Sequence, residues 1–355
     1  MRVLHLIDPA TGGWMALEAL GALLREEHPG AAHRCVLIGS ADDARAARRL
    51  GVPSHDRIHP PLRSARFAAP ALRRLLRRRP APDTLHAWSM ETLSLAAAAM
   101  PTAPRRVTLC APPQCASPSF AKAAMAPALL RRRGERRPSN IAFLSEHLRR
   151  QWAQAGLGAA AERGEIISTP PYAAGAPLPD RTALRAAWGM TDSDFIIALL
   201  GEPASALDVR RLIMSIGPLS VSGRRVACAA PIEARGMERS RRFIERLGNH
   251  LPLAPCSPLP WRTLPGVDAA VWLGADAPAG AGSTMAPGAR SIEWACALGV
   301  PVVAEDFPDS REAAASAAKS VDIPVRFTPA GRPLEIARAL LSITNQRRSH
   351  LAARS

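Results

Sequence analysis

The sequence has 355 residues, of which 47% are hydrophobic, so it is long enough for two globular domains with separate cores. No segment approaches the roughly 20 uncharged apolar residues of a membrane-spanning helix. The opening residues MRVLHLID also reach a charged side chain too soon for a secretory signal. We therefore predict a cytoplasmic protein, and we expect its six cysteines, which lack C-x-x-C spacing, to be buried thiols rather than zinc ligands or disulfides.

The net charge of +16 comes almost entirely from arginine, because only Lys122 and Lys319 are lysines among the 46 basic residues. The arginines cluster at 71–80 and 128–138, where the pattern predicts two amphipathic helices. Few aromatic residues are interleaved and no nucleic-acid motif is present, so we rank a nucleic-acid binder last. Such helices fit peripheral contact with an anionic membrane, and solvated helix faces are the alternative.

The first half of the chain alternates strands with helices. The apolar run Val3–Ile7 is followed by a glycine turn at Gly12–Gly13 and then by a helix with leucines at i, i+3 and i+7. No G-x-G-x-x-G is present, which disfavours a nicotinamide enzyme. Alternating strands and helices predict a parallel sheet covered on both faces. The further strands expected are 34–38, 84–88, 106–110, 140–144 and 165–168, with Ser145 as the N-cap of the helix after the fourth.

The proline-rich segment 169–180 indicates a linker. We predict an N-terminal domain over 1–170, a linker over 171–180 and a C-terminal domain over 181–355. The second domain begins with a helix and a turn at Gly189, and the strand Phe195–Leu200 then ends at Gly201. Its further strands are expected at 224–229, 266–275 and 321–327, before a final helix at 335–348.

The stretch APGARSIEWACALGVPVVAED (286–306) predicts a helix opened by Gly288, ended by Gly299 and followed by the strand Val302–Ala304. The unpaired N–H groups at such a helix start can form a binding site for a diphosphate. Glu293 lies about one turn inside that end, where a carboxylate could hold a ribose diol.

This stretch resembles the donor-site signature of retaining GT-B glycosyltransferases of family 4, loosely E-G-F-G-x-x-x-x-E-A-x-A-x-G-x-P-V-V-A. Gly288 and Glu293 match the first half at the family's spacing, and the run from Ala295 to Ala304 matches the second half one residue late. The likeness continues in order along the chain. It includes the turn at Gly12–Gly13, the strand, Ser-capped helix and glycine turn at 141–157, the linker, the strand ending at Gly201, and Asp268 in the strand before the donor loop.

The resemblance implies an α/β fold of two Rossmann-like doubly wound domains facing a cleft, with the acceptor bound by the first, the donor by the second, and the C-terminal helix packing back. It implies that Gly12, Gly13, Gly201 and Gly288 approach the donor phosphates and that Glu293 holds the ribose. Cys110 stands where the family has a histidine that contacts the donor sugar. His86 is a further strand-end candidate for the site.

The sequence also departs from the family. The family's Arg and Lys after the first strand of the second domain are Glu202 and Leu207 here, and its opening Glu is Met285. Arg210 and Arg211 are candidates to replace the lost cations, although on a helix they could equally face water.

The resemblance implies an enzyme that transfers a sugar from a nucleotide-sugar donor to a lipid or glycan acceptor with retention, without a metal cofactor. The absence of a D-x-D-type motif in a plausible place agrees with metal-free transfer. The alternative is a catalytically degenerate GT-B protein that acts as a nucleotide-binding or scaffold partner. For either, we expect a cytoplasmic location, with possible peripheral contact at the inner membrane face.

Overall fold

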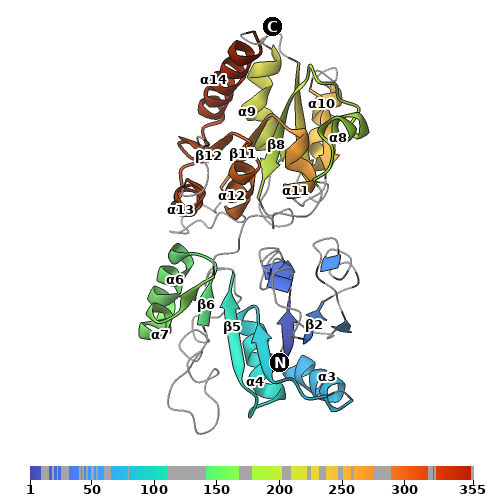
Figure 1. The fold of residues 1–355 in the computed structure, drawn as a ribbon, viewed down its shortest axis with the longest axis vertical. Coiled ribbons are helices and arrows are strands. Elements are labelled where there is room, and N and C mark those ends of the chain that lie inside the picture. Colours follow the sequence, from blue (N-terminus) through green and yellow to red (C-terminus); the bar gives the residue numbers. More distant parts are fainter. Residues whose placement is uncertain are drawn as a thin grey trace. The chain divides into compact units, whose positions relative to one another are not determined.

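A computed structural model of the chain divides into two compact units, Met1–Ala173 and Ala174–Ser355. The division falls within the proline-rich segment 169–180, and each unit has a sheet of its own (Figure 1). The structure describes residues 1–8, 16–17, 20–21, 23–24, 32–39, 41, 44, 47–48, 52, 55–59, 65–78, 80–110, 141–167, 178–201, 209–221, 225–231, 237–246, 251–256, 260–274, 289–318, 323 and 325–352.

The sheet of the first unit is parallel throughout its described strands, which are ordered β3-β2-β1-β4-β5-β6-β7. The strand order reverses at β1, which pairs with both β2 and β4. Ligands of doubly wound sheets approach the carboxyl ends of the strands at such a point. The strands are β1 (Arg2–Ile7), β2 (Ala32–Ile38), β3 (Asp56–Ile58), β4 (Thr84–Ala87), β5 (Arg105–Leu109), β6 (Ile141–Phe143) and β7 (Glu165–Ile166).

Helices α3 (Ala65–Arg77), α4 (Met90–Ala99), α6 (Glu146–Trp152) and α7 (Ala159–Glu162) accompany this sheet. One core cluster joins strands β1 to β4 with α3 and α4, and a second joins β5 and β6 with α4 and α6. Ser145 caps α6 as predicted, since its side chain accepts the Leu148 N–H at 3.1 Å. The cap and the buried core together fix where the helix after β6 begins.

The second unit has the same architecture, a parallel sheet with a reversal in its strand order. Its described strands are all parallel, in the order β10-β9-β8-β11-β12-β13, with the reversal at β8. Every residue of β8 is buried, as expected of a strand covered on both faces. The strands are β8 (Phe195–Leu200), β9 (Val226–Pro231), β10 (Leu253–Cys256), β11 (Ala269–Trp272), β12 (Val302–Glu305) and β13 (Val325–Thr328).

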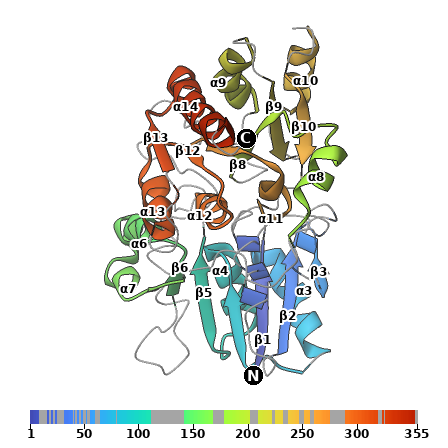
Figure 2. The same ribbon diagram turned by 45° about the horizontal axis from the view of Figure 1, so that its top comes forward.

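Helix α14 lies along α9, and both contribute to a core cluster of this unit (Figure 2). The prediction that the C-terminal helix also packs back toward the first domain stays a prediction. The helices of the second unit are α8 (Arg181–Ala187), α9 (Val209–Val221), α10 (Met237–Arg246), α11 (Pro260–Thr263), α12 (Arg290–Ala297), α13 (Pro308–Ala317) and α14 (Pro333–Ala352).

The predicted strands are confirmed, most with a shift of one or a few residues at their ends. The described cysteines are free and buried, as expected. Two strands have no counterpart in the predictions, β3 and β10, which have three and four residues and lie at the sheet edges. Such short runs are too brief to show a hydrophobic period.

Candidate functional site

The carboxyl edge of the second sheet is the place where the predicted donor-site residues gather. Strand β8 ends there at Gly201, whose φ of 120° is open to glycine but strained for other residues. Strand β11 ends there before Gly274, and β12 ends there at Glu305. Because β12 runs parallel to β11, the connecting helix α12 must begin at this same edge.

The helix–turn–strand element predicted for 286–306 is confirmed. Helix α12 ends in a Schellman motif, in which the Gly299 N–H donates to the Cys296 carbonyl and the Val300 N–H to the Ala295 carbonyl, both at 2.9 Å. Gly299 adopts a φ of 75°. The turn leads directly into β12, so the start of α12 and the end of β12 lie at the same edge of the second sheet.

Glu293 lies in the first turn of α12 and is partly exposed. Burial raises the pKa of the Cys296 thiol to about 11, and the Glu293 carboxylate reinforces that rise. Gly288, which we predict to open the helix, lies outside the described residues, as does Met285. The role of Glu293 as the ribose ligand stays a prediction.

Glu305 is a residue of this edge that the sequence pattern does not single out. It is 1% exposed, and the Gly274 N–H donates to its Oε2 at 2.7 Å while the Gly331 N–H donates to Oε1 at 2.7 Å. Arg211 donates to the same Oε1 at 2.5 Å and to the Gly274 carbonyl at 2.7 Å. We call these four residues the Glu305 cluster. The sequence signal that could have identified Glu305 is an acidic residue at the end of an otherwise apolar strand.

The two candidate arginines of α9, Arg210 and Arg211, therefore differ in their surroundings. Arg211 lies at the carboxyl edge, but its guanidinium is bonded to a buried carboxylate. Arg210, its neighbour in α9, is exposed. Glu202 and Leu207 lie outside the described residues. Whether either arginine faces a donor diphosphate stays a prediction.

Gly274 packs closely against the ring of Phe307 at this edge. A Cβ placed on Gly274 would lie 2.1 Å from Cε2 of Phe307. We expect Gly274→Ala to lower the free energy of unfolding by about 1–3 kcal/mol, because the ring has to move to admit the methyl group. Thermal unfolding followed by circular dichroism measures the change.

Gly217→Ala is the matched control. Apart from its two chain neighbours, a Cβ at Gly217, within α9, would meet nothing within 4 Å. The helix preference of alanine is opposed by the ring of the following Pro218, so this variant should stay within about 1 kcal/mol of the parent. Equal melting temperatures for the two variants would contradict the close approach at Gly274.

In the first unit, the candidates His86 and Cys110 lie inside the packing of the sheet. His86, in β4, is 3% exposed, and its Nε2 lies 2.8 Å from Thr108 Oγ1 on β5. Burial lowers the pKa of His86 well below its usual range, and the neighbouring histidines and Arg106 reinforce this. Cys110 directly follows β5 and is also buried. Gly12 and Gly13 lie outside the described residues.

His86 belongs to a histidine cluster, which we define as His5, His33, His86 and Trp88. The Trp88 Nε1–H donates to His5 Nδ1 at 3.2 Å, so a neutral His5 carries its proton on Nε2 and donates it to His33 Nδ1 at 2.9 Å. Trp88 stacks on His86 with ring centroids 4.6 Å apart. Burial, with the nearby His33 and Arg106, lowers the pKa of His5 to about 3. His5 and His86 are thus neutral near neutral pH.

Asp268, which matches the strand aspartate of the family, lies at the opposite edge of the second sheet. It directly precedes β11, so it is at the amino end of that strand. Its Oδ2 accepts from Arg185 Nη2 at 2.6 Å and from the Ile196 N–H at 2.8 Å, and its Oδ1 accepts from Arg181. These contacts hold helix α8 against β8 and β11, which is a structural task.

In the described part of the chain, no group of three or more His, Cys, Asp and Glu side chains is arranged to hold a metal ion. No helix in it combines the length and apolar character that crossing a bilayer requires. The expectation of metal-free chemistry stays a prediction.

The sequence matches no protein-family model and no curated protein. Solved structures, in contrast, match it over almost its whole length. Anabaena HepE in complex with UDP and glucose is 18% identical with a TM-score of 0.66, over 98% of this chain and 91% of that chain. The UDP-GlcNAc 2-epimerase of Neisseria meningitidis bound to UDP-GlcNAc is 12% identical with a TM-score of 0.60, over 98% and 93%. The fold is GT-B.

A glycosyltransferase from Rickettsia africae also matches, at 11% identity and a TM-score of 0.58, over 97% of this chain and 88% of that chain. The GT-B fold confirms the predicted architecture of two Rossmann-like domains. At these identities the likeness establishes the fold, and the GT-B fold serves both a transferase and an epimerase among these neighbours. Function therefore has to be argued from the residues of the site.

Proposed function

We propose that this chain is a retaining glycosyltransferase, similar to family 4, that takes its sugar from a uridine diphosphate donor. The observation that carries the proposal is the position of Glu293 in the first turn of α12, at the carboxyl edge of the second sheet. The uridine diphosphate follows from the ligands of the structural neighbours, which include UDP, UDP-glucose and UDP-GlcNAc.

The local chemistry suits a nucleotide diphosphate. The first N–H groups of a helix carry partial positive charge and attract phosphate oxygens. A carboxylate one turn further along can accept hydrogen bonds from both ribose hydroxyls. Arg210 or Arg211 would add fixed positive charge as the diphosphate leaves, so the proposed transfer uses no metal.

A specific observation favours the alternative, a degenerate GT-B protein that binds a nucleotide or a partner without turnover. The Arg211 guanidinium is bonded to Glu305, and that ion pair has no net charge to offer a leaving diphosphate. Of the two candidate cations, Arg210 then remains to balance the developing negative charge.

The acceptor in this proposal is a lipid or a glycan. We also propose that the protein works in the cytoplasm and touches the inner membrane face through its arginine-rich helices. The segment 71–80 overlaps the end of α3, and its four described arginines, Arg73, Arg74, Arg77 and Arg78, are exposed. The segment 128–138 lies outside the described residues.

Calorimetric titration of the full chain with UDP and with GDP tests the donor site. We expect micromolar binding of UDP and its loss in Glu293→Ala, because the ribose hydroxyls then lose their acceptor. Glu312→Ala, a carboxylate change in helix α13, is the control and should leave the binding unchanged. Each variant is first checked for an unchanged melting temperature.

Product analysis then separates the reactions. Release of UDP from a UDP-sugar together with a glycosylated lipid extract supports transfer, whereas conversion of one UDP-sugar into another would show an epimerase. Nucleotide binding without any product would establish the degenerate alternative. If neither nucleotide binds, the enzyme proposal is wrong.

A further inference from the structure

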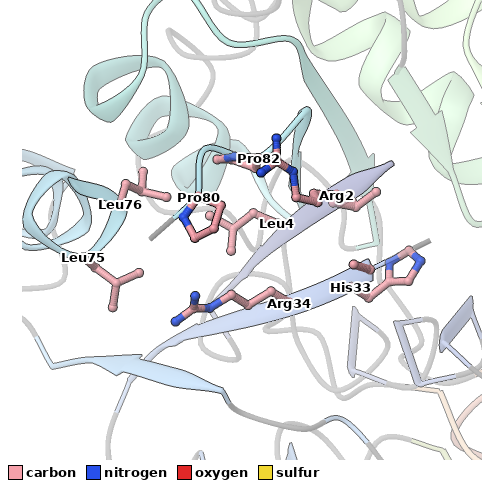
Figure 3. A pocket seen from close by; sticks show the side chains of 10 residues that line it. Arg2, Leu4, His33, Arg34, Leu75, Leu76, Pro80 and Pro82 are labelled. Carbon is pink, nitrogen blue, oxygen red and sulfur yellow. The ribbon is translucent and has the colours of Figure 1, made fainter. Parts of the chain in front are cut away.

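A pocket of about 180 Å³ opens at the amino edge of the first sheet (Figure 3). It is formed by the first residues of β1 and β2, by the end of α3 and by the segment that leads into β4. This edge is opposite to the carboxyl edge at which ligands of doubly wound sheets approach. The residues used below are Arg2, Leu4, Arg34, Leu75, Leu76 and Pro80.

The lining of the pocket is mainly apolar. Leu4 is buried in the core beneath it, Leu75 and Leu76 are partly exposed, and Pro80 is exposed. Apolar surface that stays in contact with water in an open pocket favours a hydrocarbon ligand, since burial of both surfaces releases that water.

The two arginines of the lining are already paired. Arg2 donates to Asp83 at 3.2 Å, and Arg34 donates to Asp56 through Nε at 2.6 Å. Both ion pairs hold the strands and the segment before β4 together. The lining itself therefore carries little net charge.

Three exposed arginines lie beside the pocket. Arg74 and Arg77 lie in the last turn of α3, beside Leu75 and Leu76 in the sequence, and Arg78 directly follows the helix. All three arginines are exposed. None has an acidic partner within the described part of the chain. The wider stretch 57–82 contains eight arginines and no aspartate or glutamate, and the aspartates at its two ends, Asp56 and Asp83, are bonded to Arg34 and Arg2.

We propose that this pocket receives an acyl chain of an anionic phospholipid while Arg74, Arg77 and Arg78 bind its phosphate and the anionic surface around it. The combination of an apolar hollow with exposed guanidinium groups at the end of the same helix matches the two parts of such a lipid. The proposal deepens the membrane contact proposed above and does not depend on glycosyl transfer. A lipid held at the amino edge leaves the carboxyl edge of this sheet free.

Sedimentation of the full chain with vesicles tests the charged part. We expect binding to phosphatidylcholine vesicles that contain phosphatidylglycerol, no binding to phosphatidylcholine alone, and weakening by salt. At the usual contribution of a basic side chain near an anionic surface, R74Q/R77Q/R78Q should lower the partition coefficient by roughly 100-fold. The matched control is R239Q/R241Q/R246Q, which removes the same charge from α10 of the second unit.

Titration with soluble amphiphiles tests the pocket without any variant. We expect a lysophosphatidylglycerol below its micelle concentration to bind, and glycerol phosphate, which lacks the acyl chain, not to bind. L75S/L76S should then lose the lysolipid while its circular dichroism spectrum stays that of the parent.

Three results would overturn the proposal: equal loss in the two arginine triples, vesicle binding unaffected by R74Q/R77Q/R78Q, or equal affinity for lysolipid and glycerol phosphate. UDP titration of the same preparations separates this proposal from the proposed function. Lipid binding without UDP binding would contradict the proposed donor site and would still support the proposed lipid pocket.

Discussion

Replacing Asp268 with alanine is expected to lower the free energy of unfolding of the second unit by about 3–5 kcal/mol. Its side chain is 1% exposed and that of Arg185 is 2% exposed. Removal of one partner of a buried ion pair leaves the other charge without compensation, and losses of this size are typical. Arg185 also donates from Nε to the Gly266 carbonyl at 2.9 Å, so the guanidinium cannot turn to water without giving up that bond.

Urea unfolding of the full chain, followed by hydrogen exchange of peptides from β8 and β11, measures the loss in the unit concerned. Asp192→Ala is the matched control, because Asp192 lies 3.8 Å from the same arginine but its side chain is 74% exposed. The control should change the stability by no more than about 0.5 kcal/mol. In the double variant R185M/D268A we expect part of the loss to be recovered. A loss for Asp268→Ala no larger than that of the control would show that the pair does not hold α8.

Acid is expected to destabilise the first unit well before it affects the second. The pKa of His5 is lowered from 6.5 to about 3, mainly by burial, and that of His86 is lowered for the same reason. The unfolded chain therefore binds more protons than the folded chain between these values. The stability contributed by the neutral histidines is complete above about pH 6.5 and is lost progressively as the pH falls toward 3. The unfolded chain's protonation of His5 alone should lower the free energy of unfolding by about 2 kcal/mol between about pH 7 and pH 5, and His86 adds to this loss in the same direction.

Hydrogen exchange at a series of pH values, corrected for the intrinsic exchange rate, tests this expectation. Peptides from β1 and β4 should lose protection toward pH 5, whereas peptides from β8 and β11 serve as an internal control, since no described residue of the second unit is a histidine with a lowered pKa. His86→Gln should flatten the pH dependence, because one of the two titrating groups is gone. Parallel loss of protection in both units would argue against the histidine cluster as the cause.

Much of the fold follows from local signals in the sequence. The strand Phe195–Leu200 is an unbroken apolar run, and the ends of α6 and α12 are marked by a serine cap and a glycine turn. Each of these signals involves residues close in sequence, which is why a single sequence reveals them.

The interior of the candidate site could not be predicted in the same way. Glu305 meets Arg211 across 94 positions and Gly274 across 31, and His5 meets Trp88 across 83. These contacts depend on which strands are neighbours, and that order is a property of the whole sheet. The likeness to a family also placed Asp268 in a matching position, where the structure shows a buried ion pair at the amino end of β11.

The Glu305 cluster has a consequence for the thermodynamics of any ligand that binds beside it. One carboxylate joins the start of α9, the ends of β11 and β12, and Gly331 between β13 and α14, so four segments are fixed when the unit folds. A ligand arriving at this edge finds them preorganised, and the conformational entropy of ordering them has already been lost. The affinity of such a ligand is thus set by its direct contacts at this edge, without the entropic cost of ordering these four segments.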